Sequence, residues 1–258
     1  MKNIHVLMSA SLVALMASSQ AMAAGLTAQQ IADKNAAARG GLAAWRAVDS
    51  MKLTGQMDAG GAPAVRLPFD MSLKRPHKSR LELHVKDQTA VQVYDGQQGW
   101  KLRPYLNRDD VEAFSPQETQ AAADDADLDG PLIDYARKGT RIELAGTEVV
   151  EGHKAYKLHL ARADGRKSDI WIDTSTFLDV KIEGEPRRLD NKVHKVAVFY
   201  RDFKTVDGLK VPMTLETVVE GVRQTRKINF EAVAVNPPLA ETLFARPQPA
   251  AIKQASAR

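Results

Sequence analysis

Hydrophobic and polar residues alternate over long stretches of this chain, and this period of two constrains its fold more than any other feature. In the segment 65–74 apolar residues take the odd positions, while the even positions are mostly polar. The same alternation recurs in 81–86 and 91–93. Successive side chains of a β-strand point to opposite faces, so these segments predict antiparallel strands with one dry and one wet face.

The alternation marks twelve candidate segments, from which we expect a sheet of about eleven strands. The expected strands lie at 51–57, 65–73, 81–85, 91–93, 100–102, 141–145, 153–161, 168–173, 177–183, 193–203, 211–220 and 222–233. Three Asp-Gly pairs, at 95–96, 164–165 and 207–208, are hairpin turn sequences. The fold class is therefore α+β and mostly β, and a sheet this large must curl or close because its strands twist.

Two capping boxes mark the main helices. The first begins at Thr27 and opens a helix over 29–38. The second begins at Ser115, with proline at the next position, and opens a helix that runs to Ala126. Shorter helices are expected at 42–48 and 131–136.

A curled sheet has a concave apolar face that something must cover, and the covering helices predicted here are rich in alanine. Small side chains fill a wide concavity poorly, so we expect an apolar cleft of the kind that takes lipid-like ligands. The alternative is a dry core closed by sheet and helices, and the pattern alone does not separate the two. The candidate cavity residues are Val65, Leu67, Phe69, Met71, Leu81, Leu83, Val85, Val91, Val93, Trp100, Leu132 and Tyr135.

The N-terminus has the pattern of a secretory signal peptide. Lys2 precedes an apolar run over 6–17, and Ala21 and Ala23 form a small-x-small cleavage site. We therefore expect a signal peptide at 1–23, one domain at 24–247 and a disordered polar tail at 248–258. The chain has no cysteine, so lipidation at the leader junction and disulfides are excluded.

Several other function classes find little support in the sequence. A net charge of +4 is too weak and too dispersed to indicate nucleic-acid binding. No nucleophile-elbow, P-loop or dinucleotide-binding motif occurs, so we expect no enzyme activity and no cofactor. Residues 125–130 match the start of an EF-hand loop, but Ala136 stands where the bidentate glutamate belongs. The histidines lack ligand spacing, and we expect no metal site.

Four groups of residues, in order and spacing, resemble the LolA-like periplasmic lipoprotein carriers, and most closely the broad group of outer-membrane lipoprotein-sorting proteins. They are the Lys-Arg-Pro stretch at 73–82, the Val-Tyr-Asp-Gly hairpin at 93–96 with Trp100 and Pro104, the segment 128–139, and Val-Asn-Pro-Pro at 235–238 with Leu243, Phe244 and Pro247. The resemblance covers nearly the whole chain after the leader. One difference is Ser79, where LolA itself usually carries a large apolar residue.

The resemblance implies an unclosed, LolA/LolB-like antiparallel β-barrel with a helical lid over an apolar cavity. It also implies that Arg75, in the Lys-Arg-Pro motif, hydrogen-bonds to the lid as a latch. A guanidinium has five donors in a fixed fork and can join several carbonyls at once. The alternative for Arg75 is an ordinary arginine at a strand end that faces water.

The function implied by the resemblance is that of a soluble, monomeric periplasmic carrier. It would bind acyl chains of lipoproteins or other lipids and move them between membranes, with an inner-membrane transporter and an outer-membrane acceptor as partners. Two rivals remain: a lipid-binding sensor or adaptor in envelope signalling, and an enzyme that acts on a lipid. Ser79 leaves the cargo and the handover partner open.

Overall fold

The computed structural model describes residues 25–58, 65–189, 191–223 and 225–248. The predicted signal peptide, with its cleavage after Ala23, lies outside these ranges, and so does the predicted tail from residue 249 onward. Within the described ranges, no helix combines the length and the hydrophobicity that crossing a bilayer requires.

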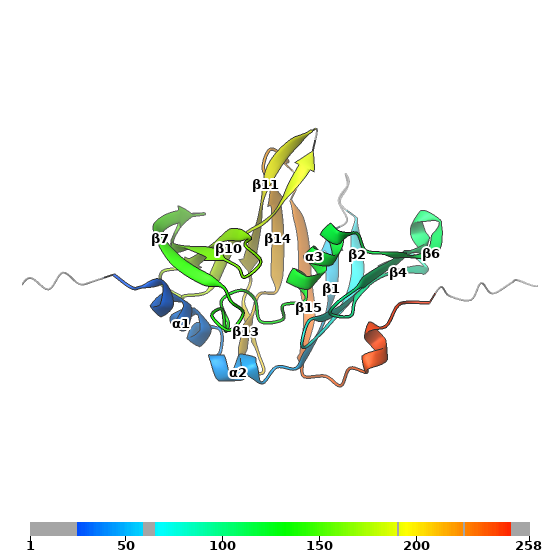
Figure 1. Cartoon of the computed structure of the whole chain (residues 1–258), viewed down its shortest axis with the longest axis horizontal. Coiled ribbons are helices and arrows are strands. Elements are labelled where there is room, and N and C mark those ends of the chain that lie inside the picture. Colours follow the sequence, from blue (N-terminus) through cyan, green and yellow to red (C-terminus); the bar gives the residue numbers. More distant parts are fainter. Residues whose placement is uncertain (1–24, 59–64, 190, 224, 249–258) are drawn as a thin grey trace, which may run out of the picture.

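In the described part of the chain, thirteen antiparallel strands join in one sheet that curves around a concave inner side (Figure 1). Its order is β6-β5-β4-β3-β2-β1-β15-β14-β11-β10-β9-β8-β7. The first six strands are β1 (Ser50–Asp58), β2 (Arg66–Lys74), β3 (Lys78–Val85), β4 (Gln88–Tyr94), β5 (Gly99–Arg103) and β6 (Arg108–Ala113). The other seven are β7 (Arg141–Val150), β8 (His153–Ala161), β9 (Lys167–Asp173), β10 (Asp179–Leu189), β11 (Lys192–Arg201), β14 (Thr214–Val219) and β15 (Arg226–Val235). The predicted mostly-β fold with a large antiparallel sheet is confirmed.

The sheet is not closed, because β6 and β7 form its two edges and do not pair with each other. These two strands follow one another in the chain. Residues 114–140, which we call the covering segment, therefore link one edge of the sheet to the other. This segment contains α3 (Pro116–Asp125), which lies over the open side between the two halves of the sheet (Figure 1).

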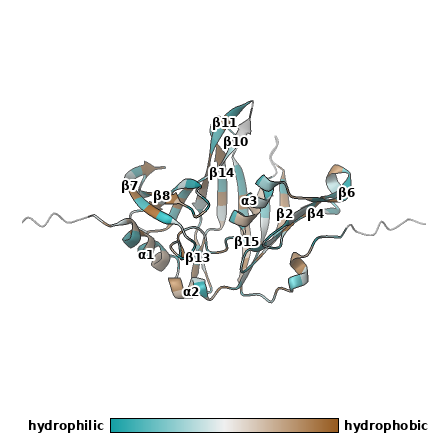
Figure 2. Ribbon diagram, viewed as in Figure 1, coloured by the Kyte–Doolittle hydropathy of each residue, from teal (hydrophilic) through white to brown (hydrophobic). Residues whose placement is uncertain are grey.

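The structure has more strands than predicted. The edge strand β6 was missed because its sequence is charged and its residues are exposed or half-buried, so it lacks an apolar face. The second omission is the hairpin of β12 (Lys204–Val206) and β13 (Leu209–Val211), whose strands of three residues are too short to show a period. The Asp-Gly pair predicted to turn at 207–208 does connect them. Hydrophobic and hydrophilic residues alternate along the long strands, as predicted (Figure 2).

Both predicted capping boxes are present. Thr27 caps α1 (Ala28–Ala38), which packs across β7–β10 through the fully buried Ile31. The short helix α2 (Leu42–Arg46) follows, and its Trp45 is buried in the central core. Ser115 caps α3 in the same way as Thr27 caps α1.

The helix predicted at 131–136 is wrong, because these residues form turns. Gly130 and Asp134 have positive φ angles of 77° and 52°, which a right-handed helix does not allow. The turns place neighbouring residues in different cores. Leu132 packs with Ile31 beneath α1, whereas Ile133 packs in the central cluster around Trp45.

A C-terminal stretch covers part of the outer face of the sheet. After β15, the chain forms a one-turn 3₁₀ helix, η2 (Glu241–Phe244), whose Phe244 is buried against β4 and β5. Glu241 forms ion pairs with Lys74 and Lys78 at 2.8 and 2.5 Å. These contacts make β2–β5 a two-sided layer, with α3 on the inner side and η2 on the outer side.

Candidate functional site

The register of the first strands shows which side chains face the inner side. Leu53, Met71 and Leu81 lie directly opposite one another across β1, β2 and β3, and Gln92 continues this row on β4. Directly opposed residues in an antiparallel pair project from the same face. Several apolar residues on the inner side remain only half-buried: Met57, Met71, Leu81, Leu83, Leu215 and Ile228. The inner side is therefore incompletely covered.

A cavity of about 160 Å³ lies between β2–β4 and α3. It is lined by Met71, Leu73, Ser79, Arg80, Leu81, Gln92, Val93, Phe114, Glu118, Ala121, Ala122 and Asp125. A more open groove of about 540 Å³ lies at the start of β1 and the end of β2, beside the segment 236–240. None of the predicted cavity residues lines that groove, so the space beneath α3 is the candidate site.

Helix α3 buries none of its residues and is held by charged contacts. At its start, Glu118 pairs with Lys101 of β5 at 2.5 Å. At its end, Asp124 pairs with Arg162 at 2.8 Å and with Arg166 at 2.5 Å, both near the β8–β9 turn. The helix thus bridges the two halves of the open sheet by ion pairs rather than by apolar packing.

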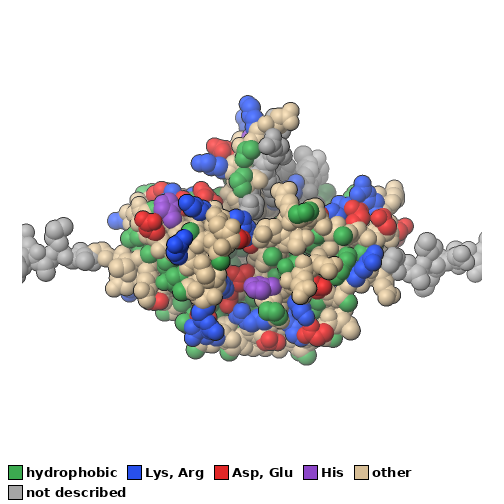
Figure 3. Space-filling view, in the orientation of Figure 1, with side chains coloured by type: hydrophobic (Ala, Val, Ile, Leu, Met, Phe, Trp, Pro, Cys, Tyr) green, Lys and Arg blue, Asp and Glu red, His purple; other side chains and the backbone are tan. Residues whose placement is uncertain are grey.

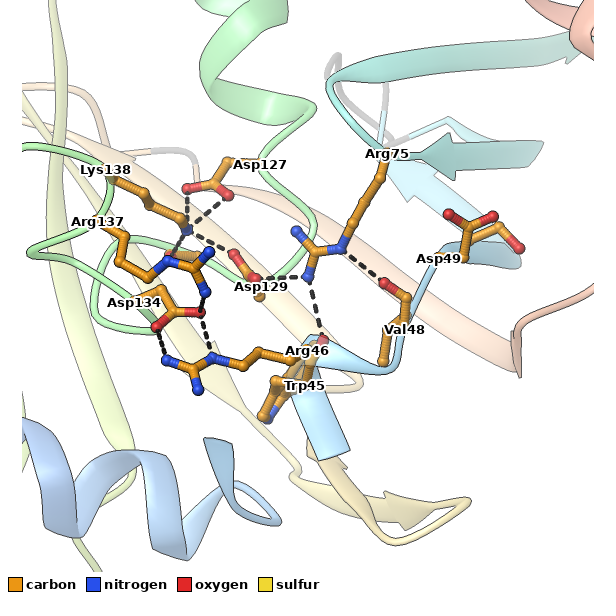
Figure 4. A network of polar contacts seen from close by, with 12 residues as sticks. Trp45, Arg46, Val48, Asp49, Arg75, Asp127, Asp129, Asp134, Arg137 and Lys138 are labelled. Carbon is orange, nitrogen blue, oxygen red and sulfur yellow. Dashed lines mark hydrogen bonds and ion pairs between the residues drawn. The ribbon is translucent and has the colours of Figure 1, made fainter. Parts of the chain in front are cut away.

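The part of the covering segment after α3 is embedded in the protein. Ala126, Leu128 and Asp129 are buried, and Asp129 is only 2% exposed. Lys138 donates hydrogen bonds to Asp129 at 2.5 Å, to both carboxylate oxygens of Asp127 and to the Gly130 carbonyl (Figure 4). The ammonium group therefore occupies the space between two acidic side chains of the EF-hand-like sequence, where a cation would be expected.

Arg75 joins this embedded part to α2 (Figure 4). Its Nη2 donates to the Asp129 carboxylate at 2.6 Å and to the Trp45 carbonyl at 3.1 Å. Its Nε donates to the Val48 carbonyl at 2.7 Å, and its backbone N–H donates to the Asp49 carbonyl. The guanidinium thus connects the end of β2, the end of α2 and the base of α3. Arg75 is therefore not an ordinary strand-end arginine that faces only water.

Two further arginines, Arg46 and Arg137, extend the network. Arg46 of α2 forms a bidentate pair with Asp134 of the covering segment, and Arg137 also lies within 3.8 Å of that carboxylate (Figure 4). Arg46 and Arg137 are more exposed than Arg75, and Asp134 is more exposed than Asp129. Since exposed ion pairs contribute little, Arg75 and Asp129 are the central members of the network.

Three carboxyl groups near the base of α3 have displaced pKa values. Burial raises the pKa of Asp127 to about 6, against the opposing effect of Lys138. Asp125 is exposed at the margin of the cavity, where partial desolvation by the cavity wall and the neighbouring Asp124 raise its pKa to about 6. Burial also acts to raise the pKa of Asp129, but Lys138 and Arg75 outweigh it and hold this pKa below its usual value.

The structure places the predicted cavity residues partly in the cavity wall and partly in the hydrophobic cores or elsewhere. Met71 and Leu81 line the cavity, and Leu83 lies on the same inner face beside them. Phe69 is fully buried in the central core, and Leu132 is buried beneath α1. Leu67 and Val85, at inner positions of β2 and β3, and Tyr135 of the covering segment are half-buried and do not line the cavity, while Val65 is exposed just before β2.

Val91 and Trp100 pack in the outer layer and do not line the cavity, which corrects their placement in its wall, whereas Val93 is buried in that layer and also lines the cavity. Val91 and Val93 are buried against Phe244, and Trp100 packs beside them. Val93 borders the cavity as well, but its register partner is Arg80 rather than Leu81. A two-residue turn joins β3 and β4, with Val85 opposite Gln88, so the even positions of β4 face inward with the odd positions of β3.

Other lining residues were missed in the sequence. Gln92 was overlooked because a polar residue was assigned to the solvent-exposed face. The two-residue β3–β4 turn places it opposite Leu81, on the inner face. Ala121 and Ala122 carry no signal beyond their place in a capped helix. Phe114 lies just before α3, and its ring contacts Gly99, where any side chain would collide with it.

One group of possible metal ligands occurs among the described residues. Asp70, Glu82 and His84 lie close together on β2 and β3, on the outer face. Charged neighbours already engage both acids, since Lys52 lies 3.4 Å from Asp70 and Arg80 pairs with Glu82. The group is therefore a surface ion cluster rather than a candidate metal centre.

The fold of the chain is LolA-like. It is similar to the structure of a LolA superfamily protein from Nitrosomonas europaea, with a TM-score of 0.58 and 15% identity over 86% of this chain and 98% of that one. A structure described as an outer membrane lipoprotein-sorting protein domain from Vibrio parahaemolyticus gives a TM-score of 0.55 at 12% identity, over 84% and 95% of the two chains. A DUF1329 family protein from Desulfovibrio piger gives 0.59 at 13% identity, over 84% and 97%.

These likenesses confirm the predicted fold, an unclosed antiparallel sheet with few helices. Their sequence identities are low, so they bear on architecture and not on the ligand. No family model matches the sequence, and no curated protein matches it either.

Proposed function

We propose that this protein binds acyl chains of lipoproteins or other lipids on the inner side of the sheet, beneath α3, and carries them between membranes in the periplasm. The observation that carries the proposal is the contrast between the two sides of the cavity. The sheet presents half-buried apolar side chains such as Met71 and Leu81, while the helix above them buries none of its own residues.

The proposal requires α3 to move when a ligand enters, because the cavity is small. Pockets for small-molecule ligands typically have volumes of about 300–1,000 Å³, and the space beneath α3 is about 160 Å³. Each buried CH₂ group contributes about 0.8 kcal/mol. Displacement of α3 breaks the ion pairs of Glu118 and Asp124, which are half-exposed and therefore individually weak.

In this proposal Arg75 acts as a latch at the base of α3. Its bonds to Asp129, Trp45 and Val48 hold the start of the embedded part of the covering segment against α2. The helix can then swing about this fixed base without displacing the buried Leu132 and Ile133. Loss of Arg75 frees the base itself and weakens the coupling between closure and release.

The experiment is binding of a fluorescent fatty acid, together with mass spectrometry of lipid retained by the natively purified protein. Ala122→Trp fills the cavity from the helix side and is expected to lower affinity at least about tenfold. Gln120→Trp is the matched control, since Gln120 lies on the same helix, is exposed and does not line the cavity. Absence of retained lipid and of fatty-acid binding would refute the proposal.

A transfer assay separates a carrier from a sensor. Protein loaded with an acylated peptide is mixed with acceptor vesicles, and movement of the label is followed over time. A carrier releases the label to the vesicles, whereas a sensor retains it. An enzyme would instead convert the bound lipid, which the same mass spectra reveal as a product that accumulates with time.

A further inference from the structure

The inner side of the sheet changes from apolar to polar at Tyr200 of β11. One row of opposed residues crosses β1, β15, β14 and β11, and it consists of Met57, Ile228, Leu215 and Tyr200. Directly opposed residues project from the same face, so Tyr200 lies on the inner side with the half-buried apolar residues of this row. Its hydroxyl is the first polar group that the row presents.

A buried polar group lies beside Tyr200, where β10 begins. Asp179 faces inward opposite Ile172, and its carboxylate lies 3.6 Å from Nε of Arg39. Asn35 of α1 donates a hydrogen bond to the same carboxylate at 3.2 Å. Within the described ranges, Oδ1 of the buried Asn35 has no hydrogen-bond partner, and neither has Nε of Arg39. Since proteins pair most of their buried polar atoms, the hydrogen bonding of this region is incomplete.

The Tyr200 hydroxyl is available to a ligand. Tyr200 is half-buried, and in the part of the chain that the structure describes its hydroxyl makes no hydrogen bond. Desolvation by the surrounding protein raises the pKa of Tyr200, and the negative charges of Asp179 and Asp125 add to this effect. The hydroxyl therefore stays protonated, so it can both donate and accept a hydrogen bond. Asp125 also lines the cavity beneath α3, which connects that cavity to Tyr200.

The charges around this hydroxyl favour a ligand without negative charge. The nearby cations already have carboxylate partners: Arg39 has Asp179, Arg162 and Arg166 have Asp124, and Lys138 has Asp127 and Asp129. Asp125 has no hydrogen-bond or ion-pair partner among the described residues, and its pKa of about 6 leaves it mainly ionised at pH 7. Acidic and basic side chains are visible together in the hollow between the two halves of the molecule (Figure 3).

A carboxylate or phosphate group on the ligand would meet the unpaired charge of Asp125 and be repelled. A hydroxyl or an amide N–H could instead donate a charge-assisted hydrogen bond to it. The same cavity is lined by Met71 and Leu81, so one ligand can reach the apolar wall and the carboxylate together.

We propose that the ligand is an acyl chain joined to an uncharged headgroup with hydroxyl or amide donors, and that this headgroup binds between Tyr200 and Asp125. The chain lies against Met71 and Leu81. The Asp125 carboxylate accepts from a hydroxyl or N–H of the headgroup, and the Tyr200 hydroxyl donates to one of its oxygens. This inference rests on the acyl-binding proposal and specifies the ligand class of that site.

The test compares three probes that share one palmitoyl chain, by their displacement of a fluorescent fatty acid. Monopalmitoylglycerol is uncharged and carries hydroxyl donors, methyl palmitate is uncharged and carries none, and palmitate is an anion. A site that hydrogen-bonds a ligand hydroxyl discriminates against analogues that lack it. Monopalmitoylglycerol is therefore expected to bind about tenfold more tightly than either of the other two.

Two substitutions assign this preference to the headgroup site. Tyr200→Phe should reduce the preference for monopalmitoylglycerol over methyl palmitate to less than about threefold. Its midpoint of urea unfolding should not change, because the hydroxyl that is removed makes no hydrogen bond within the described residues. Asp125→Ala should weaken binding of monopalmitoylglycerol but strengthen binding of palmitate, and a loss of structure would not move the two probes in opposite directions.

Two matched controls should keep the parent preference. Tyr105→Phe changes an exposed tyrosine between β5 and β6, and Asp109→Ala changes an exposed aspartate of β6. Equal binding of the three probes, a preference for palmitate, or an unchanged preference in both Tyr200→Phe and Asp125→Ala would overturn this inference and leave the acyl-binding proposal standing. If none of the probes binds, the acyl-binding proposal fails and this inference falls with it.

Discussion

The two alanine-rich helices that cover the inner side begin alike but are held in different ways. Both α1 and α3 open with a complete capping box. Helix α1 buries four residues, among them Ile31 and Asn35, and Asn35 also donates a hydrogen bond to the buried Asp179. Helix α3 buries none and is tied to the sheet by Glu118 and Asp124. The same local signal therefore begins one helix that is held by a dry core and one that is held by ion pairs.

The largest expected effect tests this contrast at equivalent positions. Ile31 in α1 and Thr119 in α3 are each four residues after the N-cap. Ile31→Ala should lower the free energy of unfolding by about 2–5 kcal/mol, because it leaves a cavity in a dry core. Thr119→Ala should change it by less than about 0.5 kcal/mol. Urea unfolding of both variants checks this, and equal effects would show that α3 is packed as firmly as α1.

Arg75→Leu should have the next largest effect. It removes three hydrogen bonds and leaves the buried Asp129 carboxylate with Lys138 alone, so we expect a loss of about 2 kcal/mol in stability. Hydrogen exchange should speed up at residues 126–139 and in α3. Arg108→Leu, at an exposed ion pair, is the control and should leave the exchange rates unchanged. Unaltered exchange in Arg75→Leu would exclude the latch.

A smaller effect is expected at the end of α3. Asp124→Asn breaks the contacts to Arg162 and Arg166, which should reduce global stability by less than about 1 kcal/mol. Exchange in α3 should nevertheless increase, while exchange in α1 stays constant. Asp164→Asn is a matched control, because Asp164 also pairs with Arg166 but lies outside the covering segment. If both variants behave alike, Asp124 does not hold the helix.

The smallest effect concerns pH. The folded-state pKa values of Asp125 and Asp127 are about 6, above the usual 3.8, so the folded form binds more protons between these values. Their ionisation therefore destabilises the folded form as pH rises from about 4 to about 6. For Asp125, which lines the cavity at the end of α3, acidification from pH 7 to 5 should also favour the closed position of the helix. Asp129 acts oppositely, but only below its usual pKa.

Fluorescence of a dye on α3, followed from pH 7 to 5, measures this effect. Asp125→Asn removes one titrating group and should flatten the profile, whereas Asp109→Asn, on the exposed strand β6, should leave it unchanged. A profile that is identical in the parent protein and in Asp125→Asn would assign the pH dependence to other groups.

Local signals in the sequence were sufficient for the helices with capping boxes and for most long strands. They failed where the inward face of a strand depends on the number of residues in the preceding turn, and where a turn depends on the backbone φ angle. The alternation at Val91 and Val93 shows that one face is apolar, but not which face turns inward, and the β3–β4 turn decides that. The turns at 131–136 depend on the positive φ of Asp134, which the apolar pattern of Leu132 and Ile133 conceals.

The site was less predictable than the fold, because it forms between segments that are distant in sequence. Arg75 could be singled out from its motif, yet its partners Asp129 and Val48 are 54 and 27 residues away. The position of Lys138 between Asp127 and Asp129 could not be read from spacing, since the same acids matched the beginning of a calcium loop.

The lack of pairing between β6 and β7 has a consequence for how much the protein can hold. In a closed barrel, strand number and shear fix the girth, and widening it breaks backbone hydrogen bonds between strands. Here the edge strands β6 and β7 are not paired with each other, so they could separate without breaking any backbone hydrogen bond between strands. Only side-chain contacts between the two halves of the sheet, such as the Asp124–Arg162 ion pair, would be lost. If the protein binds acyl chains as proposed, one sheet could therefore enclose ligands of different thickness without any change in its strand pairing.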